Sequence, residues 1–143
     1  MAVKLYNAKQ VSVIVGTRVL TGFAEDAMVT VERDEDSWTK QVGVDGETTR
    51  SRSNNNGGKV TIQLMQTSDD NDFLSGINQA DEATANGVLP ITVRDQNGRT
   101  LCFSPSGWIM KPPSSEFNRE ATGREWVIDC AELAMFTGGN TRQ

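Results

Sequence analysis

Alternation of apolar and polar residues over positions 59–66 is the feature that most restricts how this chain can fold. Val60, Ile62 and Leu64 occupy every second position there, so they share one face of an extended segment. The opposite face carries the polar residues Lys59, Thr61 and Gln63. Successive side chains of a strand point to opposite sides, so a period of two is typical of a strand with one buried face. The chain is therefore predicted to build its core on one face of a β-sheet.

Shorter patterns of the same kind predict further strands at residues 10–15, 18–23, 28–32, 38–44, 91–95, 100–104, 108–110 and 125–133. Asn97-Gly98 lies between two of these strands. This dipeptide favours a tight hairpin with positive φ at both central residues, and the resulting register places Val93 opposite Cys102. Pro112-Pro113 ends the strand at 108–110, because proline cannot donate to a strand ladder.

One helix is predicted between the strands at 59–66 and 91–95. Residues 68–70 offer an N-cap and acidic side chains in the first turn, where the helix dipole favours them. Phe73 and Ile77 recur at helical spacing, and Asn86-Gly87 provides a stop. We therefore expect a mainly β fold with one α-helix, a β-sandwich or small barrel, in a single domain spanning residues 1–143.

The composition favours assembly over catalysis. Hydrophobic residues make up 36% of the 143 residues and charged residues 23%, which leaves a thin core and much polar surface. The net charge of −5 argues against tight nucleic acid binding, because such binding usually needs a basic patch. The chain has no histidine, so zinc sites and His-dependent catalysis are not expected. We expect a protein that is not an enzyme and has no metal or cofactor.

Other special sites are also not expected. Cys102 and Cys130 form no CxxC motif and are interpreted as two reduced core thiols. The acidic residues 32–36 lack the spacing of a calcium loop, and those at 69–72 are explained by helix capping. No apolar run approaches the roughly 20 residues that span a bilayer, and the N-terminus lacks the apolar region of a signal peptide.

The segment Val42–Gly58 is polar and predicted to be a long loop without secondary structure, a type of loop that often carries function. Residues 24–47 hold eight acidic and two basic residues, whereas residues 48–59 hold three basic residues and no acidic one. A basic arm beside an acidic body suits a head-to-tail contact between copies. The residues predicted to make this contact are Val42, Gly43, Val44, Asp45, Gly46, Glu47, Thr48, Thr49, Arg50, Ser51, Arg52, Ser53, Asn54, Asn55 and Asn56.

Several stretches, taken in order, resemble the tail tube proteins of a small family of contractile-tailed bacteriophages. The stretches are VIVG at 13–16 with LTGFA at 20–24, VTVERDED at 29–36, VGVDGE at 42–47 with Arg50, VTIQL at 60–64 followed by Thr67-Ser68, and FNRE at 117–120 with REW at 124–126. The combination covers most of the chain at this length.

The resemblance implies a structural protein of the virion tail, assembled in the host bacterial cytoplasm. Copies would form hexameric rings whose strands join into an inter-subunit β-barrel, and the rings would stack into a hollow tail tube. DNA would pass through as transient cargo, together with the tape measure protein. Other expected partners are the tail sheath, baseplate and tail terminator proteins, with no membrane. The loop Val42–Gly58 would reach the neighbouring subunit or ring.

A polar and partly acidic channel wall would let DNA slide past without sticking, because it repels phosphates. The outward residues of the clearest strands are the candidates for this wall: Thr30, Glu32, Thr61, Gln63 and Asp129. A slip of one residue in a strand would exchange its two faces, so this choice depends on the register.

Two alternatives remain open. One is a ring of the haemolysin-coregulated type from a contractile secretion system, which would stack less strongly. The other is a stand-alone β-sandwich that binds carbohydrate or peptide, which should expose aromatic residues. Trp38, Trp108 and Trp126 all lie within strand patterns, so we expect them to pack in the core.

Overall fold

The computed structural model describes residues 3–24 and 28–139. Its elements are η1 (Ala8–Gln10), β1 (Val11–Val15), β2 (Arg18–Val19), β3 (Val29–Arg33), β4 (Trp38–Val42), β5 (Thr48–Arg52), β6 (Gly58–Met65), α1 (Asp70–Thr84), β7 (Leu89–Asp95), β8 (Leu101–Lys111), β9 (Gly123–Cys130) and β10 (Ala134–Phe136). The predicted class, mainly β with one α-helix in the described part, is confirmed. Glu25 and Asp26 of the acidic stretch, and the tail from Asn140, lie outside the described residues.

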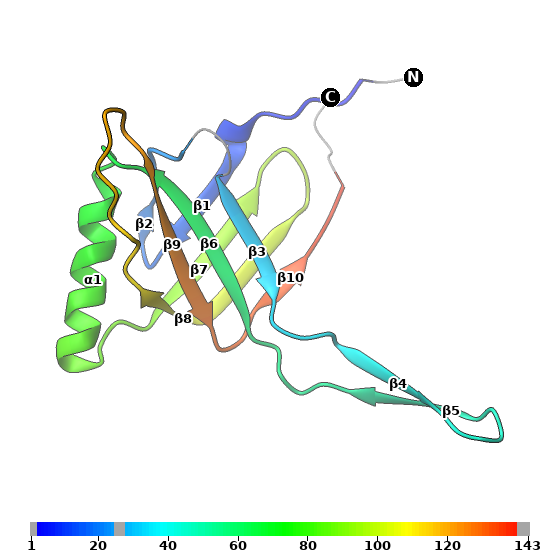
Figure 1. Ribbon diagram of the computed structural model, residues 1–143. Helices are drawn as coiled ribbons and strands as arrows, with labels where there is room; N and C mark the ends of the chain where they lie inside the picture. Colours follow the sequence, from blue (N-terminus) through cyan, green and yellow to red (C-terminus); the bar gives the residue numbers. More distant parts are fainter. Residues whose placement is uncertain (1–2, 25–27, 140–143) are drawn as a thin grey trace.

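The body is built on one sheet with the strand order β2-β1-β7-β8-β9-β6-β3, and β10 pairs with β8. The sheet bends over, so that β3, β6 and β9 cross in front of β1, β7 and β8 (Figure 1). Its strand order is an open path that ends at β2 and β3, so the sheet does not close into a barrel among the residues that the structure describes. The predicted sandwich-like layering is thus produced by a single sheet.

The core fills the space inside the bent sheet. The alternation in β6 is reproduced in full, because Val60, Ile62 and Leu64 are completely buried while the residues between them are half-buried. Trp126 and Ile128 of β9 bury the same face. Helix α1 covers part of this core with Leu74, Phe73 and Ile77.

The ends of α1 differ from the prediction. Asp69 occupies the N-cap position but its side chain makes no capping bond, and the Ser68 hydroxyl accepts from the Asp70 N–H at 3.3 Å. The helix stops at Thr84, two residues before the predicted stop, because Ala85 adopts a left-handed φ of 56°. The Ala85 N–H closes this end on the Asp81 carbonyl.

The loop between β7 and β8 confirms the predicted register but not the predicted turn. Val93 pairs with Cys102 as expected. Neither Asn97 nor Gly98 is among the described residues with positive φ, so the predicted turn type is wrong. Asn97 is fully buried and exchanges hydrogen bonds with the backbone of Asn7, at 3.0 Å and 2.9 Å. The hydrogen bonds between Asn97 and the N-terminal segment therefore outweigh the preference of Asn-Gly for a tight hairpin turn.

The three tryptophans have different environments. Trp126 is buried as predicted, and its indole N–H donates to the Asn71 side-chain oxygen at 2.9 Å. Trp108 is half-buried. The prediction is wrong for Trp38, which is 43% exposed because β4 belongs to a hairpin that leaves the body.

Candidate functional site

The segment Val42–Gly58 is not an irregular loop. Residues 48–52 of this segment form β5, which pairs with β4. The two strands make a separate two-stranded sheet, here called the arm (Trp38–Arg52). Figure 1 shows the arm extending away from the body. All ten residues of its two strands are exposed. The prediction of a loop without secondary structure was therefore wrong, because β5 contains no apolar residue to reveal a strand pattern.

The tip of the arm (residues 42–47) is a tight turn. The Gly43 N–H donates to the Glu47 carbonyl at 2.7 Å, and the Gly46 N–H donates to the Gly43 carbonyl at 3.0 Å. Gly46 has a φ of 88°, a conformation that favours glycine. The Asp45 carboxylate accepts from the Glu47 N–H at 3.1 Å. The turn leaves Val44 fully exposed, directly before the acidic residue Asp45.

The register of the arm gives it two unlike faces. Trp38 pairs with Arg52 and Lys40 with Arg50, so these four residues share one face. The guanidinium carbon of Arg50 lies 3.7 Å from the centre of the Trp38 ring. The opposite face carries Thr39, Gln41, Thr49 and Ser51. We call the face with Lys40, Arg50 and Arg52 the cationic face, and the opposite face the hydroxyl face. The hydroxyl face contains no charged residue.

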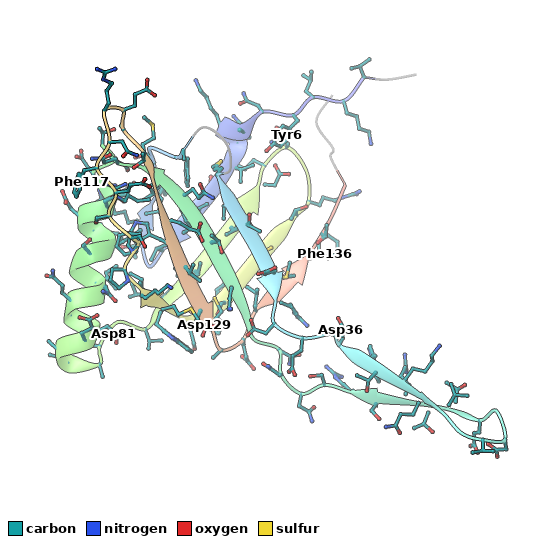
Figure 2. All side chains as sticks on the ribbon, viewed as in Figure 1. Tyr6, Asp36, Asp81, Phe117, Asp129 and Phe136 are labelled. Carbon is teal, nitrogen blue, oxygen red and sulfur yellow. The ribbon has the colours of Figure 1, made fainter. Side chains whose placement is uncertain are left out.

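The five residues predicted to line a channel share one face of β3, β6 and β9, opposite the core. Thr30 pairs with Thr61 and Glu32 pairs with Lys59. Lys59 pairs in turn with Asp129, and Gln63 with Glu125. Side chains directly opposite across antiparallel strands lie on the same face, so Glu32, Lys59 and Asp129 form a row of alternating charge. Figure 2 shows the side chains on this part of the sheet, with Asp129 labelled.

Two neighbouring surface features were missed at the sequence level. An apolar patch on β8 and β10 consists of Leu101, Phe103 and Phe136, which are 43%, 38% and 61% exposed. Beside it, at the root of the arm, lies a shallow hollow of about 280 Å³, here called the root hollow. Its lining comes from four strands and their loops: Arg33, Arg52, Asn56, Phe103, Pro105, Glu132, Leu133 and Ala134. The alternation of Leu101 and Phe103 indicates that both lie on one face of a strand. No sequence pattern indicates that this face lies near Arg33, which is about 70 residues away.

Reactive groups are few. Cys102 and Cys130 are free and buried, and burial raises the pKa of both thiols above the ordinary value. Among residues 3–24 and 28–139, no three metal-ligating side chains gather in one place. The same residues contain no helix with the length and apolar character to cross a membrane. The candidate site is therefore a pair of surfaces, the arm and the polar sheet face, that can contact other molecules through hydrogen bonds, charged groups and apolar side chains.

The fold is that of tube and terminator proteins of contractile injection systems. The terminating cap of the anti-feeding prophage tube matches with a TM-score of 0.60 and 10% identity over 96% of this chain and 95% of that one. The sheath/tube terminator of an extracellular contractile injection system, PVC, also gives 0.60, with 12% identity over 96% of this chain and 100% of that one. The PVC sheath-tube complex gives 0.57, with 12% identity over 91% and 90%.

Sequence comparison narrows this class to a family. Residues 7–138 match the family of the bacteriophage PhiTE tail tube protein. Structural protein ORF10 of Pseudomonas phage KPP10 is 34% identical over 145 residues, covering 96% of this chain and 84% of that protein. The chain belongs to the PhiTE tail tube protein family, and is a structural protein of a phage tail. The resemblance seen in the sequence is thereby confirmed.

Proposed function

We propose that copies of this chain form hexameric rings that stack into a hollow tube, through which DNA and the tape measure protein pass. The arm is the observation that carries this proposal. A two-stranded hairpin alone is only marginally stable in water, and all ten strand residues of the arm are exposed. Such an element is explained if neighbouring copies cover it. The protein then acts as a building block and not as an enzyme.

The open sheet supports a ring of joined copies. β3 pairs with β6 on one side, and its other edge has no strand partner in the part of the chain that the structure describes. Exposed edges invite pairing with other chains, and closing a sheet into a barrel removes them. Copies that join edge to edge would therefore complete an inter-subunit β-barrel.

The polar sheet face is the proposed channel wall. Thr30, Thr61 and Gln63 are uncharged, and the row containing Glu32 and Asp129 has two carboxylates against one lysine. A wall of this kind offers DNA no cluster of positive charge to bind. The apolar patch and the arm would then be available for contacts between subunits.

The proposed external partners are a tail sheath, a tail terminator and a baseplate. The solved structures with this fold include a sheath/tube terminator and a sheath-tube complex, which supports such partners in the same kind of machine.

Electron microscopy of the concentrated protein tests the function. Hollow filaments are expected from the unmodified chain. The matched control lacks residues 38–52, with Ser37 joined to Ser53 through a short glycine turn; the Ser53 N–H already donates to the Ser37 carbonyl at 2.8 Å. This control should keep the thermal stability of the body and form no filaments.

Other outcomes identify the alternatives. Discrete rings that never stack would favour a ring of the haemolysin-coregulated type. A monomer that persists at high concentration would favour a stand-alone binding module and overturn the proposal.

A further inference from the structure

The arm carries charged side chains that form no ion pair with any residue that the structure describes. Among the described residues, Arg18 and Asp70 form the one ion pair. The Arg50 guanidinium lies over the Trp38 ring, and Arg52 lines the root hollow. At the other end, Asp45 and Glu47 of the tip are exposed and make no ion pair with a described residue.

The tip combines these acidic residues with exposed aliphatic ones. Val42 is 61% exposed and Val44 is fully exposed. Aliphatic and acidic side chains are thus presented together at the far end of an element that projects from the body (Figure 1).

The root hollow has the complementary character. Phe103, Leu133 and Ala134 contribute apolar surface, and Arg33 and Arg52 contribute two positive charges against the single carboxylate of Glu132. The Arg33 guanidinium is held in place because it donates to the Leu133 carbonyl at 2.8 Å. An acidic and aliphatic segment therefore matches both the charge and the apolar lining of the hollow.

The tip cannot occupy the hollow of its own chain. Four residue steps of β5 separate Thr48 from Arg52, which at 3.3 Å per residue is about 13 Å, and the turn lies beyond them. The paired strands hold the tip away from the root. Only a second copy can bring a tip to this hollow, and a contact between unlike surfaces of identical chains repeats from copy to copy.

We propose that the tip of the arm of one copy docks in the root hollow of the next copy, and that this head-to-tail contact connects successive rings. The inference rests on the proposed tube and specifies which surfaces meet. Val42 and Val44 would contact Phe103 and Leu133, and the acidic tip residues would face Arg33 and Arg52. The hydroxyl face of the arm takes no part in the contact.

Charge exchange between tip and hollow tests the contact. Glu47→Arg makes the tip basic, and Arg52→Glu makes the hollow acidic. Each change alone should raise the critical concentration for assembly at least about tenfold, because one docked charge pair becomes repulsive. Sedimentation and electron microscopy measure this concentration. Ser51→Glu, beside Arg52 but on the hydroxyl face, is the matched control and should leave it within about threefold.

Complementation distinguishes docking from general damage. The double variant Glu47→Arg/Arg52→Glu should assemble again, because its basic tip meets an acidic hollow. An equimolar mixture of the two single variants should also assemble, since each supplies the partner that the other lacks. Thermal melting should be the same for all variants, because the exchanged side chains lie outside the core.

The outcomes separate two failures. Single variants that assemble normally, or a double variant and a mixture that both stay defective, would overturn the docking contact while the tube itself stands. Failure of the unmodified chain to assemble at any concentration would overturn the proposed tube, and this contact with it.

Discussion

The carboxylate of Asp70 at the start of α1 accepts a hydrogen bond from the Arg18 side chain in β2 at 2.6 Å. Its second oxygen accepts from the Thr21 backbone N–H at 2.5 Å. Asp70 is 2% exposed, whereas the Arg18 side chain is 47% exposed and lies over the Phe73 ring. One buried carboxylate thus fastens the short edge strand β2 to the helix.

This contact predicts how stability depends on pH. Burial acts to raise the pKa of Asp70, but the hydrogen bonds from Thr21 and Arg18 outweigh it and hold the pKa below the ordinary 3.8. A depressed pKa in the folded state stabilises the protein above the unfolded pKa, and this stability is lost as pH falls through the folded pKa. Asp70→Asn should lower the free energy of unfolding by about 2 kcal/mol at neutral pH, because the hydrogen bonds from Arg18 and Thr21 lose their charged acceptor.

Urea denaturation at several pH values measures the effect. The difference between Asp70→Asn and the unmodified chain should shrink as the pH falls below 3.8. Asp72→Asn, an exposed change in the same helical turn, is the control and should cost less than about 0.5 kcal/mol. An equal loss from both variants would contradict the role given to Asp70.

Trp38→Ala tests whether the cationic face of the arm is covered in the assembly. The ring is 43% exposed in the free chain and stacks on Arg50. Buried tryptophans at interfaces often contribute more than about 1.4 kcal/mol, so the critical concentration should rise about tenfold while the melting temperature stays unchanged. Thr39→Ala on the hydroxyl face is the control. Equal effects of the two changes would show that the arm has no preferred face.

Gly58→Ala tests the packing where β6 meets β3 and β9. A Cβ at Gly58 would collide with the Leu133 side chain and the Glu32 carbonyl. Overpacking of this kind typically costs about 1–3 kcal/mol, which equilibrium unfolding measures. Gly123→Ala, in the paired strand β9, is the control because its nearest neighbours lie 3.7 Å away. A similar loss of stability in both variants would mean that the conformational freedom of glycine, and not the space around Gly58, determines the cost of the substitution.

Charge reversal tests the polar sheet face as a channel wall. Glu32→Lys/Asp129→Lys would place three lysines in one cross-strand row with Lys59. Assembled tubes should then retain short fluorescent DNA in a salt-sensitive manner, because released counterions drive binding to clustered cations. Glu116→Lys/Glu120→Lys makes the same charge change in the exposed segment 112–122. Equal retention by both variants would contradict the assignment of the wall.

The sequence predicted those parts of the fold that depend on strand faces. The alternation at 59–66 and in β3 assigned Val60 to the core and Thr30 to the outer face, and pairing across β3, β6 and β9 then brought the polar residues together. The register of Val93 with Cys102 was also correct, because it depends on loop length and alternation.

Features that depend on contacts distant in the sequence could not be predicted. The turn at Asn97 is decided by Asn7, 90 residues away. β5 reads TTRSR, which lacks an apolar period, so the sequence predicts a loop at 42–58 and does not reveal the hairpin that carries Trp38 away from the core. The root hollow combines β3, β5, β8 and β10, and no local pattern indicates that these strands meet.

The exposed arm also has a consequence for the kinetics of tube formation. In a free copy, the arm is ordered by its own contacts, namely pairing of β4 with β5, the hydrogen bonds of the tip and the stacking of Arg50 on Trp38, and a lone hairpin of this kind is marginally stable. In the proposed tube, a growing end offers an ordered surface that can hold an incoming arm, whereas two free copies must both order their arms before they meet. Elongation from a preformed seed would therefore outpace spontaneous nucleation, and filaments would start where another tail component provides the first surface.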